Sequence, residues 1–385
     1  MFVYKCKHLI IYICNMKMID LKTLEFLYLE NFEKNLKGRR ILYEDIAPLL
    51  QKLSTLFKKE ILGYSESNIP IYKISIGTGK TKILIWSQMH GNESTGTKSL
   101  FDLFNFFEKN NAELSKEIAS ILTNCTIQFI PMLNPDGAIK FTRENEQNID
   151  LNRDAVDRKA VESRLLRSVL DDFNPKFCFN LHDQRSIFNV EGTKNPATIS
   201  FLAPSEDAER TVTKGRKETM CVIVAMNNLL QQVIPNHIGR YTDEFYPTAT
   251  GDNFQKLGHN TILIEAGHFK DDYEREITRK YNFYALLQGI YFISTENDFW
   301  NYKPYYDIPN NDTKFLDIIY KNIKITKNNG IQIVDIGIQL KFKVIANELV
   351  AYKHIEKEGD LSNYYSRNYI DAENLDIKEL KLSNS

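Results

Sequence analysis

Residues 81–97 read TKILIWSQMHGNESTGT, an apolar run that passes directly into a polar stretch. The run at 81–88 is the length of a strand, and its consecutive apolar residues are typical of a central strand that is buried on both faces. The polar stretch at 89–97 contains two glycines, and residues 100–107 then carry apolar side chains at helical spacing. This segment therefore predicts a buried strand, a polar loop and a helix, in that order.

The same alternation continues along most of the chain. We expect further strands at 71–76, 126–131, 176–181 and 261–265, and helices over most of 20–62 and at 161–170, 216–233 and 281–293. Strands that alternate with helices predict an α/β fold, here a mixed, mainly parallel twisted sheet with helices on both faces. In such sheets the functional side chains lie at the carboxyl ends of strands.

The pattern changes after residue 300. Residues 318–325 and 331–350 alternate with many β-branched side chains, and Asn328-Asn329-Gly330 between them is a hairpin signal. We therefore expect a catalytic domain at 19–305 and a small β-rich region at 306–385. Residues 1–18 are a candidate non-native N-terminal extension, because Met16 and Met18 offer later starts.

Composition excludes some classes of partner. The chain has 49 Lys and Arg against 50 Asp and Glu, a net charge of -1, so no overall field attracts nucleic acid or an anionic membrane. Its five cysteines are an odd number without a C-x-x-C pair, which argues against a disulfide framework or a cysteine zinc site. The first 15 residues make a poor signal peptide and are too short to span a bilayer. We expect a cytoplasmic protein.

His90 and Glu93 stand three residues apart just after the buried strand. Imidazole nitrogen and carboxylate oxygen are both good zinc ligands, and Gly91 between them allows a sharp turn. His-x-x-Glu is also common by chance, and a catalytic zinc site needs a third protein ligand. The pair by itself therefore does not establish a metal site.

His182 is the candidate for the third ligand. Of the seven histidines, it ends the predicted strand at 176–181, as His90 follows an earlier strand. Strand-end side chains of one parallel sheet can converge. Taken alone, His182 would be read as a hydrogen-bonded core residue, and His237, His259 and His268 remain alternatives.

Arg143, Asn152 and Arg153 follow the turn Asn134–Gly137. An arginine offers a two-pronged donor to a carboxylate, or a fixed positive charge to a developing oxyanion. Taken separately, these would be ordinary surface residues. Two arginines and an asparagine, ten residues from first to last, would suit recognition of a carboxylate and of a developing oxyanion.

Glu265 ends the apolar strand at 261–265. A carboxylate at the end of a buried strand is costly unless it has a partner or a task. Beside a metal it would suit general-base catalysis. A salt-bridged or helix-capping Glu explains the position equally well.

Together these segments resemble the zinc metallocarboxypeptidase family, in the carboxypeptidase A-like superfamily, and its bacterial-type members in particular. The resemblance covers about residues 70–290. The matching strings are HGNEST at 90–95, NPDG at 134–137, DLNRD at 150–154, NLHDQR at 180–185 and EAGHF at 265–269.

The resemblance implies a metallocarboxypeptidase with one Zn²⁺ per chain, bound by His90, Glu93 and His182. The substrate would be a peptide with a free C-terminal carboxylate. Glu265 would be the general base that takes a proton from water and passes it to the leaving amine.

The resemblance also implies how the substrate is held. Arg143 would polarise the scissile carbonyl, and Asn152 and Arg153 would bind the terminal carboxylate. The family has a mobile tyrosine upstream of the general base, for which Tyr246 is the candidate and Tyr241 the reserve. A further position, Asp252, falls near the region that lines the side-chain pocket, which would favour a basic C-terminal residue.

One position departs from the pattern. Asn92 stands where the digestive enzymes carry an arginine that helps to bind substrate, and no secreted pro-segment with a signal is evident. A digestive role is therefore not expected. Trimming of intracellular peptides or of cell-wall peptides fits better.

Two other functions are weighed against the peptidase. An N-acyl amino acid deacylase of the aspartoacylase or succinylglutamate desuccinylase type shares H-G-N-E, D-L-N-R and a C-terminal β domain, but the N-P-D-G turn and Tyr246 favour the peptidase.

The second alternative is a binding module without catalysis. Such a module would be expected to lack a metal ligand or the general base, and the sequence retains all three candidate ligands and Glu265.

Overall fold

A computed structural model describes residues 17–109, 111–327, 330–373 and 375. Most of the candidate extension at 1–18 lies outside these residues. Among the described residues, none of the helices combines the length and the apolar character needed to cross a bilayer. The cytoplasmic location stays a prediction.

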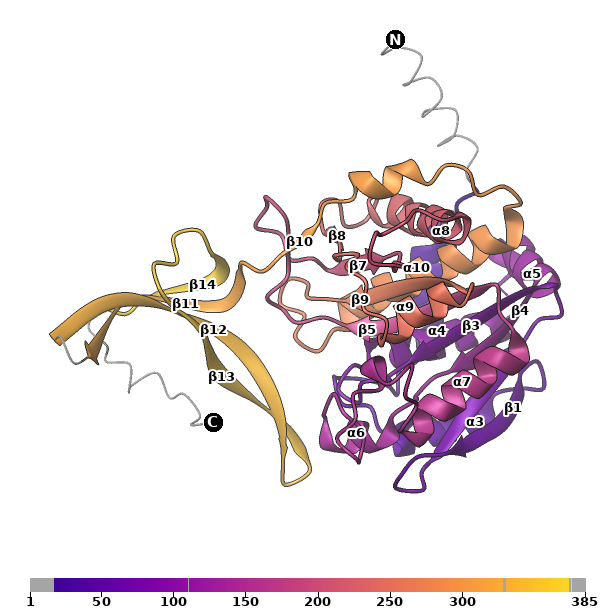
Figure 1. Ribbon diagram of the computed structural model, residues 1–385, viewed down its shortest axis with the longest axis horizontal. Helices are drawn as coiled ribbons and strands as arrows, with labels where there is room; N and C mark the ends of the chain where they lie inside the picture. The colour runs from indigo at the N-terminus through magenta and orange to yellow at the C-terminus, as the bar shows by residue number, and fades with distance from the viewer. Residues whose placement is uncertain (1–16, 110, 328–329, 374, 376–385) are drawn as a thin grey trace, which may run out of the picture.

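A single eight-stranded sheet forms the centre of the molecule (Figure 1). Its four central strands pair in parallel in the order β4-β3-β5-β9, and the neighbours β2 and β7 join them antiparallel. The prediction of a mixed, mainly parallel sheet is confirmed. In the order β1-β2-β4-β3-β5-β9-β7-β8, the strands are Lys58–Tyr64, Pro70–Ile76, Cys125–Ile130, Thr81–Ser87, Phe177–Asp183, Asn260–Ala266, Ile199–Leu202 and Ile238–Arg240.

Helices cover both faces of this sheet, as predicted. The helices α4, α5, α8 and α10 pack on one face, and α7 and α9 on the other. We call the sheet with its helices the α/β unit. From α2 to α10 the helices are Leu21–Asn31, Tyr43–Lys52, Thr95–Glu108, Ser115–Asn124, Pro135–Lys140, Val161–Phe173, Lys214–Leu230, Thr250–Lys256 and Glu276–Thr295.

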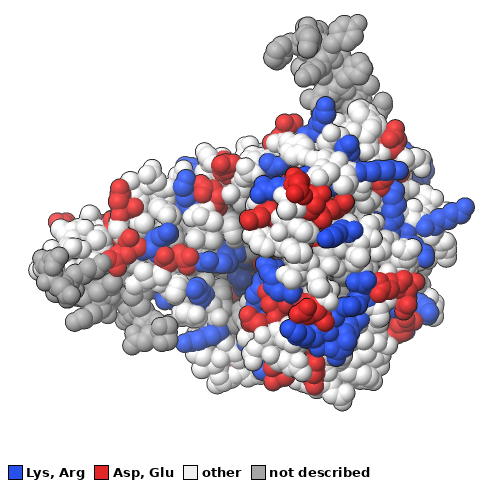
Figure 2. Space-filling view, in the orientation of Figure 1, with Lys and Arg blue, Asp and Glu red and all other residues white. Residues whose placement is uncertain are grey.

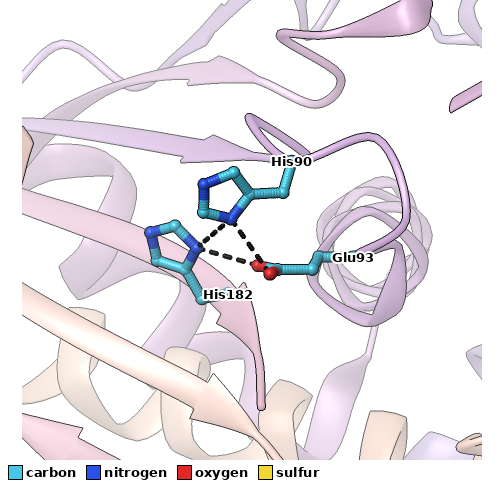
Figure 3. A group of neighbouring side chains, drawn as sticks. All are labelled: His90, Glu93 and His182. Carbon is cyan, nitrogen blue, oxygen red and sulfur yellow. Dashed lines mark hydrogen bonds and ion pairs between the residues drawn. The ribbon is translucent and has the colours of Figure 1, made fainter. Parts of the chain in front are cut away.

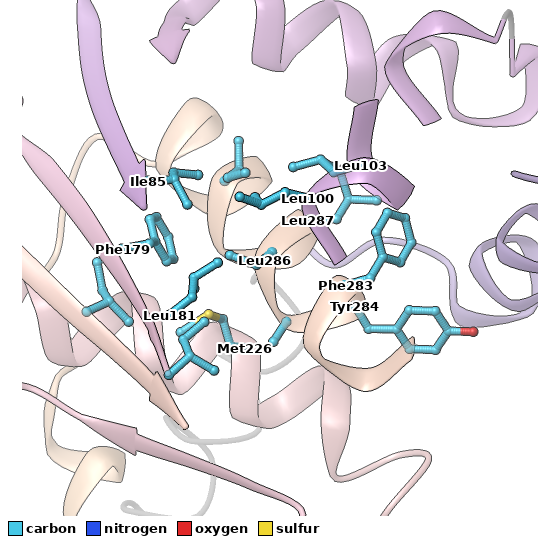
Figure 4. Packing of buried hydrophobic residues seen from close by; sticks show 14 of the residues in the cluster. Ile85, Leu100, Leu103, Phe179, Leu181, Met226, Phe283, Tyr284, Leu286 and Leu287 are labelled. Atoms are coloured by element: carbon cyan, nitrogen blue, oxygen red, sulfur yellow. The ribbon is translucent and has the colours of Figure 1, made fainter. Parts of the chain in front are cut away.

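The apolar run in β3 serves both layers. Ile83 and Ile85 pack into the cluster with α4 and α10, whereas Leu84 and Trp86 pack against α7 and α9, and all four are 0 % exposed. Figure 4 shows the first of these layers, in which side chains of β3 and β5 meet those of α4, α8 and α10. Each fully buried side chain of this kind contributes about 1.5–3 kcal/mol, so burial on both faces fixes β3 at the centre.

The sequence patterns were wrong at one edge of the sheet. The helix expected over most of 20–62 is two helices, α2 and α3, followed by strand β1 from Lys58. Residues 58–64 pair antiparallel with β2 across a bulge, and this pairing with another segment outweighs the local helical spacing.

A separate four-stranded sheet follows the α/β unit, and we call it the C-terminal sheet. It confirms the predicted β-rich C-terminal region, and β11 pairs antiparallel with β12 on either side of the expected hairpin turn. Asn328 and Asn329 of that turn lie outside the described residues. The domain limits at residues 18 and 305 stay predictions. In the order β13-β12-β11-β14, the strands are Glu348–Gly359, Gly330–Ile345, Phe315–Lys327 and Tyr365–Asp371.

Candidate metal centre

His90 and Glu93 lie in the connection between β3 and α4, at the carboxyl edge of the sheet. This loop contacts the turn at Asn134 closely, because a Cβ at Gly91 would lie 1.9 Å from the backbone carbon of Gly137. Asn134 donates from Nδ2 to the Met89 carbonyl at 3.2 Å. The N-P-D-G turn therefore supports the loop that carries two of the three candidate ligands.

The side chains of His90, Glu93 and His182 converge on one point (Figure 3). One carboxylate oxygen of Glu93 lies 2.9 Å from Nδ1 of His90, and the other lies 2.8 Å from Nδ1 of His182. The two Nδ1 atoms are 3.1 Å apart, and all three side chains are buried. Each of the three residues offers one ligand atom, and these atoms all lie within 4.8 Å of one another. Among the described residues, no other group of three His, Cys or acidic side chains meets this criterion.

This arrangement fits a divalent cation. A neutral imidazole nitrogen without a proton is an acceptor, so two facing Nδ1 atoms beside a carboxylate bring three electron-rich atoms together. Two imidazole nitrogens and one carboxylate oxygen are a donor set typical of catalytic zinc, in which a fourth position is taken by water or substrate. The residues present therefore fit the metal that the sequence predicts.

Asp150 lies on the outer side of His90, at Nε2, and Arg143 contacts both residues. Asp150 lies 3.0 Å from Nε2 of His90 through one oxygen and accepts from Nε of Arg143 at 2.9 Å through the other. Burial acts to raise the pKa of the Asp150 carboxyl, but the hydrogen bonds to His90 and Arg143 and the charge of Arg143 hold it well below its usual range. A carboxylate on the far nitrogen of a metal-binding histidine fixes the ring and its tautomer. Sequence reasoning gave Asp150 no role, although it begins the D-L-N-R-D string.

Glu265 lies in β9, directly opposite His182 of β5 in the parallel register. Burial raises the pKa of its carboxyl well above the usual range, and the nearby charges of Glu93 and Asp183 act in the same direction. Its Oε2 atom is buried without a hydrogen-bond partner among the described residues. A buried carboxylate without such a partner is expensive, which is consistent with a catalytic task.

Asn152 and Arg153 form part of the 3₁₀ turn Leu151–Arg153 beside α9. Asn152 accepts at Oδ1 from the Thr250 amide at 3.0 Å, and the Arg153 guanidinium lies 5.8 Å from the ring centre of Tyr246. Tyr246 is 45 % exposed and donates its hydroxyl to Glu244. The structure thus brings Arg153 and Tyr246 together at the surface.

The reserve tyrosine, Tyr241, is affected by the charges of the candidate metal centre. Burial, together with the charges of Glu265 and Glu93, raises the pKa of its hydroxyl well above the usual range. Asp252 is buried near the start of α9, where it accepts from the Tyr246 amide at 3.1 Å. Burial raises the pKa of Asp252 to about 6.

The alternative histidines lie elsewhere. His237 and His259 contact the carbonyl oxygens of Pro196 and Pro175 through Nδ1, at 3.0 and 2.7 Å. His268 packs against the ring of Tyr273. None of these three belongs to the described metal-ligating group.

Comparison with known proteins also finds similarity to zinc carboxypeptidases. Residues 42–212 match the family model for zinc carboxypeptidases. Carboxypeptidase 2 of Trichophyton tonsurans is 30% identical over 104 residues, which are 26% of this chain and 19% of the fungal protein. Carboxypeptidase SOL1 of Arabidopsis thaliana is 24% identical over 185 residues, 43% of this chain and 37% of the plant protein. The chain thus matches about a fifth of the length of its fungal relatives.

Solved structures share the fold. The metallo-carboxypeptidase from Burkholderia cenocepacia has a TM-score of 0.52 at 14% identity and covers 65% of this chain and 67% of its own. Carboxypeptidase A from Helicoverpa armigera has a TM-score of 0.52 at 13% identity, over 72% of this chain and 81% of its own. The match to the zinc carboxypeptidase family model covers less than half of the chain, and it includes the positions of His90, Glu93 and His182.

Proposed function

We propose that this chain is a zinc-dependent metallocarboxypeptidase that removes C-terminal residues from peptides. The observation that carries the proposal is the meeting of His90, Glu93 and His182 around one point at the carboxyl edge of the sheet. In the same region Glu265 stands beside His182, and Arg143 lies next to His90.

Each residue has a chemical task in this proposal. A bound Zn²⁺ would polarise the scissile carbonyl and make water a stronger nucleophile. Glu265 takes the proton from that water and later delivers it to the leaving amine, as a general base and then a general acid. Arg143 stabilises negative charge on the carbonyl oxygen, and its Nη1 atom lies 3.6 Å from a Glu93 oxygen, at the edge of the cluster.

Binding of the terminal carboxylate would make the enzyme an exopeptidase. Asn152 and Arg153 supply an amide and a guanidinium, and Arg153 suits a carboxylate because its N–H groups form a fork. The ring of Tyr246 beside Arg153 would cover the bound end of the peptide. Asp252, buried beneath Tyr246, would line the pocket for the last side chain.

The metal ligands are tested by zinc analysis of purified variants. We expect about one Zn²⁺ per wild-type chain and little in His182→Ala, which loses one of three protein ligands. His237→Ala is the matched control, because His237 contacts a backbone carbonyl outside the cluster. Full zinc content in His182→Ala would show that the third ligand is a different residue.

The general base is tested in the same preparations. Glu265→Gln keeps the shape of the side chain but cannot accept a proton, so it should retain zinc and lose about 10²-fold or more in kcat. The assay compares peptides with a free C-terminus, the same peptides with an amidated C-terminus, and N-acyl amino acids. Faster hydrolysis of N-acyl amino acids than of free peptides would contradict the peptidase and favour the deacylase.

A further inference from the structure

We call the three candidate ligands His90, Glu93 and His182 the metal cluster. A cavity of about 450 Å³ opens beside it, between the α/β unit and the C-terminal sheet. Glu93 and Arg143 line it on the side of the cluster, and Lys341, Phe342 and Tyr352 of β12 and β13 line the other side. In Figure 2, Lys and Arg side chains gather around the hollow between the two units. The C-terminal sheet is therefore one wall of the space next to the proposed catalytic residues.

Positive side chains dominate this cavity. Two acidic residues line it, Glu93 and Asp183, against five basic ones. Two of the five have carboxylate partners outside the cavity lining: Arg143 pairs with Asp150, and Arg185 with Glu356. The basic lining residues are Arg39, Arg143, Arg185, Arg275 and Lys341.

Two of these positive charges have no ion-pair partner within the described chain, Arg39 and Lys341. The Arg39 guanidinium lies 4.6 Å from the ring centre of Phe342, so packing on the C-terminal sheet holds it in place. Its Nε atom is buried without a hydrogen-bond partner among the described residues. Burial and the neighbouring Arg275 guanidinium lower the pKa of Arg39 to about 9, and the charges of Asp183, Glu274 and Asp317 offset only part of this shift, so a further anion here would be stabilising.

The wall formed by the C-terminal sheet is fixed to the segment that follows His182. Arg185 pairs with Glu356 of β13 at 2.7 Å. The Ser186 hydroxyl contacts the side chains of Asp317 and Gln339, at 3.1 and 2.9 Å. Because one short segment carries both a candidate metal ligand and these anchors, the wall is held in register with the metal cluster.

The position of the cavity indicates which part of a peptide it would receive. Its described lining includes Glu93 and Arg143 but neither Asn152 nor Arg153, the residues proposed to bind the terminal carboxylate. A peptide held at its end by Asn152 and Arg153 would pass the cluster and reach the cavity with the residues that precede the scissile bond.

We propose that the α/β unit and the C-terminal sheet together form an anion-binding subsite for acidic side chains on the acyl side of the scissile bond. The subsite rests on the proposed peptidase function and gives it a substrate class, peptides with acidic residues just before the one removed. Arg39 and Lys341 supply charge from opposite walls, and a carboxylate between them forms charge-assisted hydrogen bonds.

The test uses pairs of peptides that end in the same residue and differ only in having Glu-Glu or Gln-Gln before it. Wild-type protein should show kcat/KM about tenfold or more higher for the Glu-Glu peptide, because its carboxylates form charge-assisted hydrogen bonds in the subsite that the Gln amides do not. Lys341→Glu should reduce this ratio about tenfold or more, and Lys341→Gln should reduce it less. Lys324→Glu makes the same charge change at an exposed site on β11 outside the cavity and should leave the ratio unchanged.

A binding measurement separates this proposal from the peptidase function. A fluorescent hexaglutamate with an amidated C-terminus should bind wild type and Lys324→Glu equally, and Lys341→Glu about tenfold more weakly. If no peptide is hydrolysed but this difference in Kd persists, the peptidase function fails and the subsite stands. If peptides are hydrolysed with equal kcat/KM for Glu-Glu and Gln-Gln, and Kd does not respond to Lys341→Glu, the subsite is overturned.

Discussion

At the scale of single residues, the contact between Asp150 and His90 decides how firmly the candidate metal site is held. One oxygen of Asp150 forms a hydrogen bond with Nε2 of His90, and the other accepts a hydrogen bond from Nε of Arg143. It therefore orients a ligand and the proposed oxyanion-stabilising arginine at once. The metal site depends on a side chain that would not touch the metal.

We expect Asp150→Ala to weaken zinc binding about 10–100-fold, the usual cost of removing such a partner. The measurement is a competition titration of the purified protein against a chelator of known zinc affinity. Asp157→Ala is the control, because Asp157 is exposed and pairs only with exposed Lys159 in the described chain. Equal zinc affinity in Asp150→Ala and wild type would remove Asp150 from the site.

The second prediction at this scale concerns Asp252, whose pKa is raised from 3.8 to about 6 by burial. Arg153 and Arg216 oppose this rise without cancelling it. A folded-state pKa above the unfolded value means that the protonated carboxyl favours folding. The stabilisation is therefore complete below pH 3.8 and is lost as the pH rises through about 6.

Asp252→Asn removes this titration while keeping an oxygen for the Tyr246 amide. The free energy of unfolding of the variant minus that of wild type should therefore increase between pH 4 and pH 7. Urea denaturation at a series of pH values measures it. A difference that stays constant over this range would show that Asp252 does not titrate there.

At the scale of elements, a buried ion pair joins α4 to α10. Arg279 of α10 contacts both carboxylate oxygens of Asp102 in α4 and donates to the carbonyls of Glu33 and Leu36. Asp102 also accepts from the Glu33 amide at 2.7 Å. These contacts connect the two helices to the segment after α2, on the face of the sheet opposite α7.

Removing the charge of Asp102 leaves the buried guanidinium of Arg279 with Glu276, 3.1 Å away, as its remaining counter-ion. We expect Asp102→Asn to lower the free energy of unfolding by about 3–5 kcal/mol. The comparison is Asp171→Asn in α7, which breaks a surface pair with Arg167 and should cost less than about 0.5 kcal/mol. Urea denaturation at neutral pH measures both, and similar small losses in the two variants would contradict the prediction.

At the scale of the whole molecule, Asp317 connects the C-terminal sheet to the α/β unit. It is 1 % exposed and accepts from the hydroxyls of Ser186 and Tyr273 and from the Leu340 amide. Two of these donors belong to the α/β unit and one to β12. Asp317 therefore helps to keep the wall of the cavity in place, together with the Arg185–Glu356 ion pair.

Asp317→Ala leaves the Tyr273 hydroxyl and the Leu340 amide without their acceptor, which costs about 1–3 kcal/mol for each one that water cannot reach, whereas the Ser186 hydroxyl keeps Gln339 as an acceptor. Hydrogen exchange should accelerate in β12 around Leu340 more than in β3. Asp335→Ala is the control, because Asp335 pairs with Lys321 within the C-terminal sheet. Unchanged exchange in β12 would show that other contacts hold the two units together.

Much of the α/β unit follows from local pattern. An apolar run such as that of β3 is stable only when both faces are covered, so residues 81–88 predict a central strand without knowledge of its neighbours. The positions of His90, His182 and Glu265 follow in the same way, because each lies at, or just after, the carboxyl end of a strand of one sheet. Residues 58–62 were wrongly assigned to a helix, since β1 exists only through its pairing with β2.

The sequence by itself therefore determined the central sheet, the candidate ligands and the presence of a β-rich C-terminal region. Tertiary structure alone decided that Asp150 holds His90, and that Arg39 meets Phe342 across the basic cavity. The physical reason is that periodicity reports which face of an element is buried, whereas a polar contact between distant segments depends on where the folded chain places both partners.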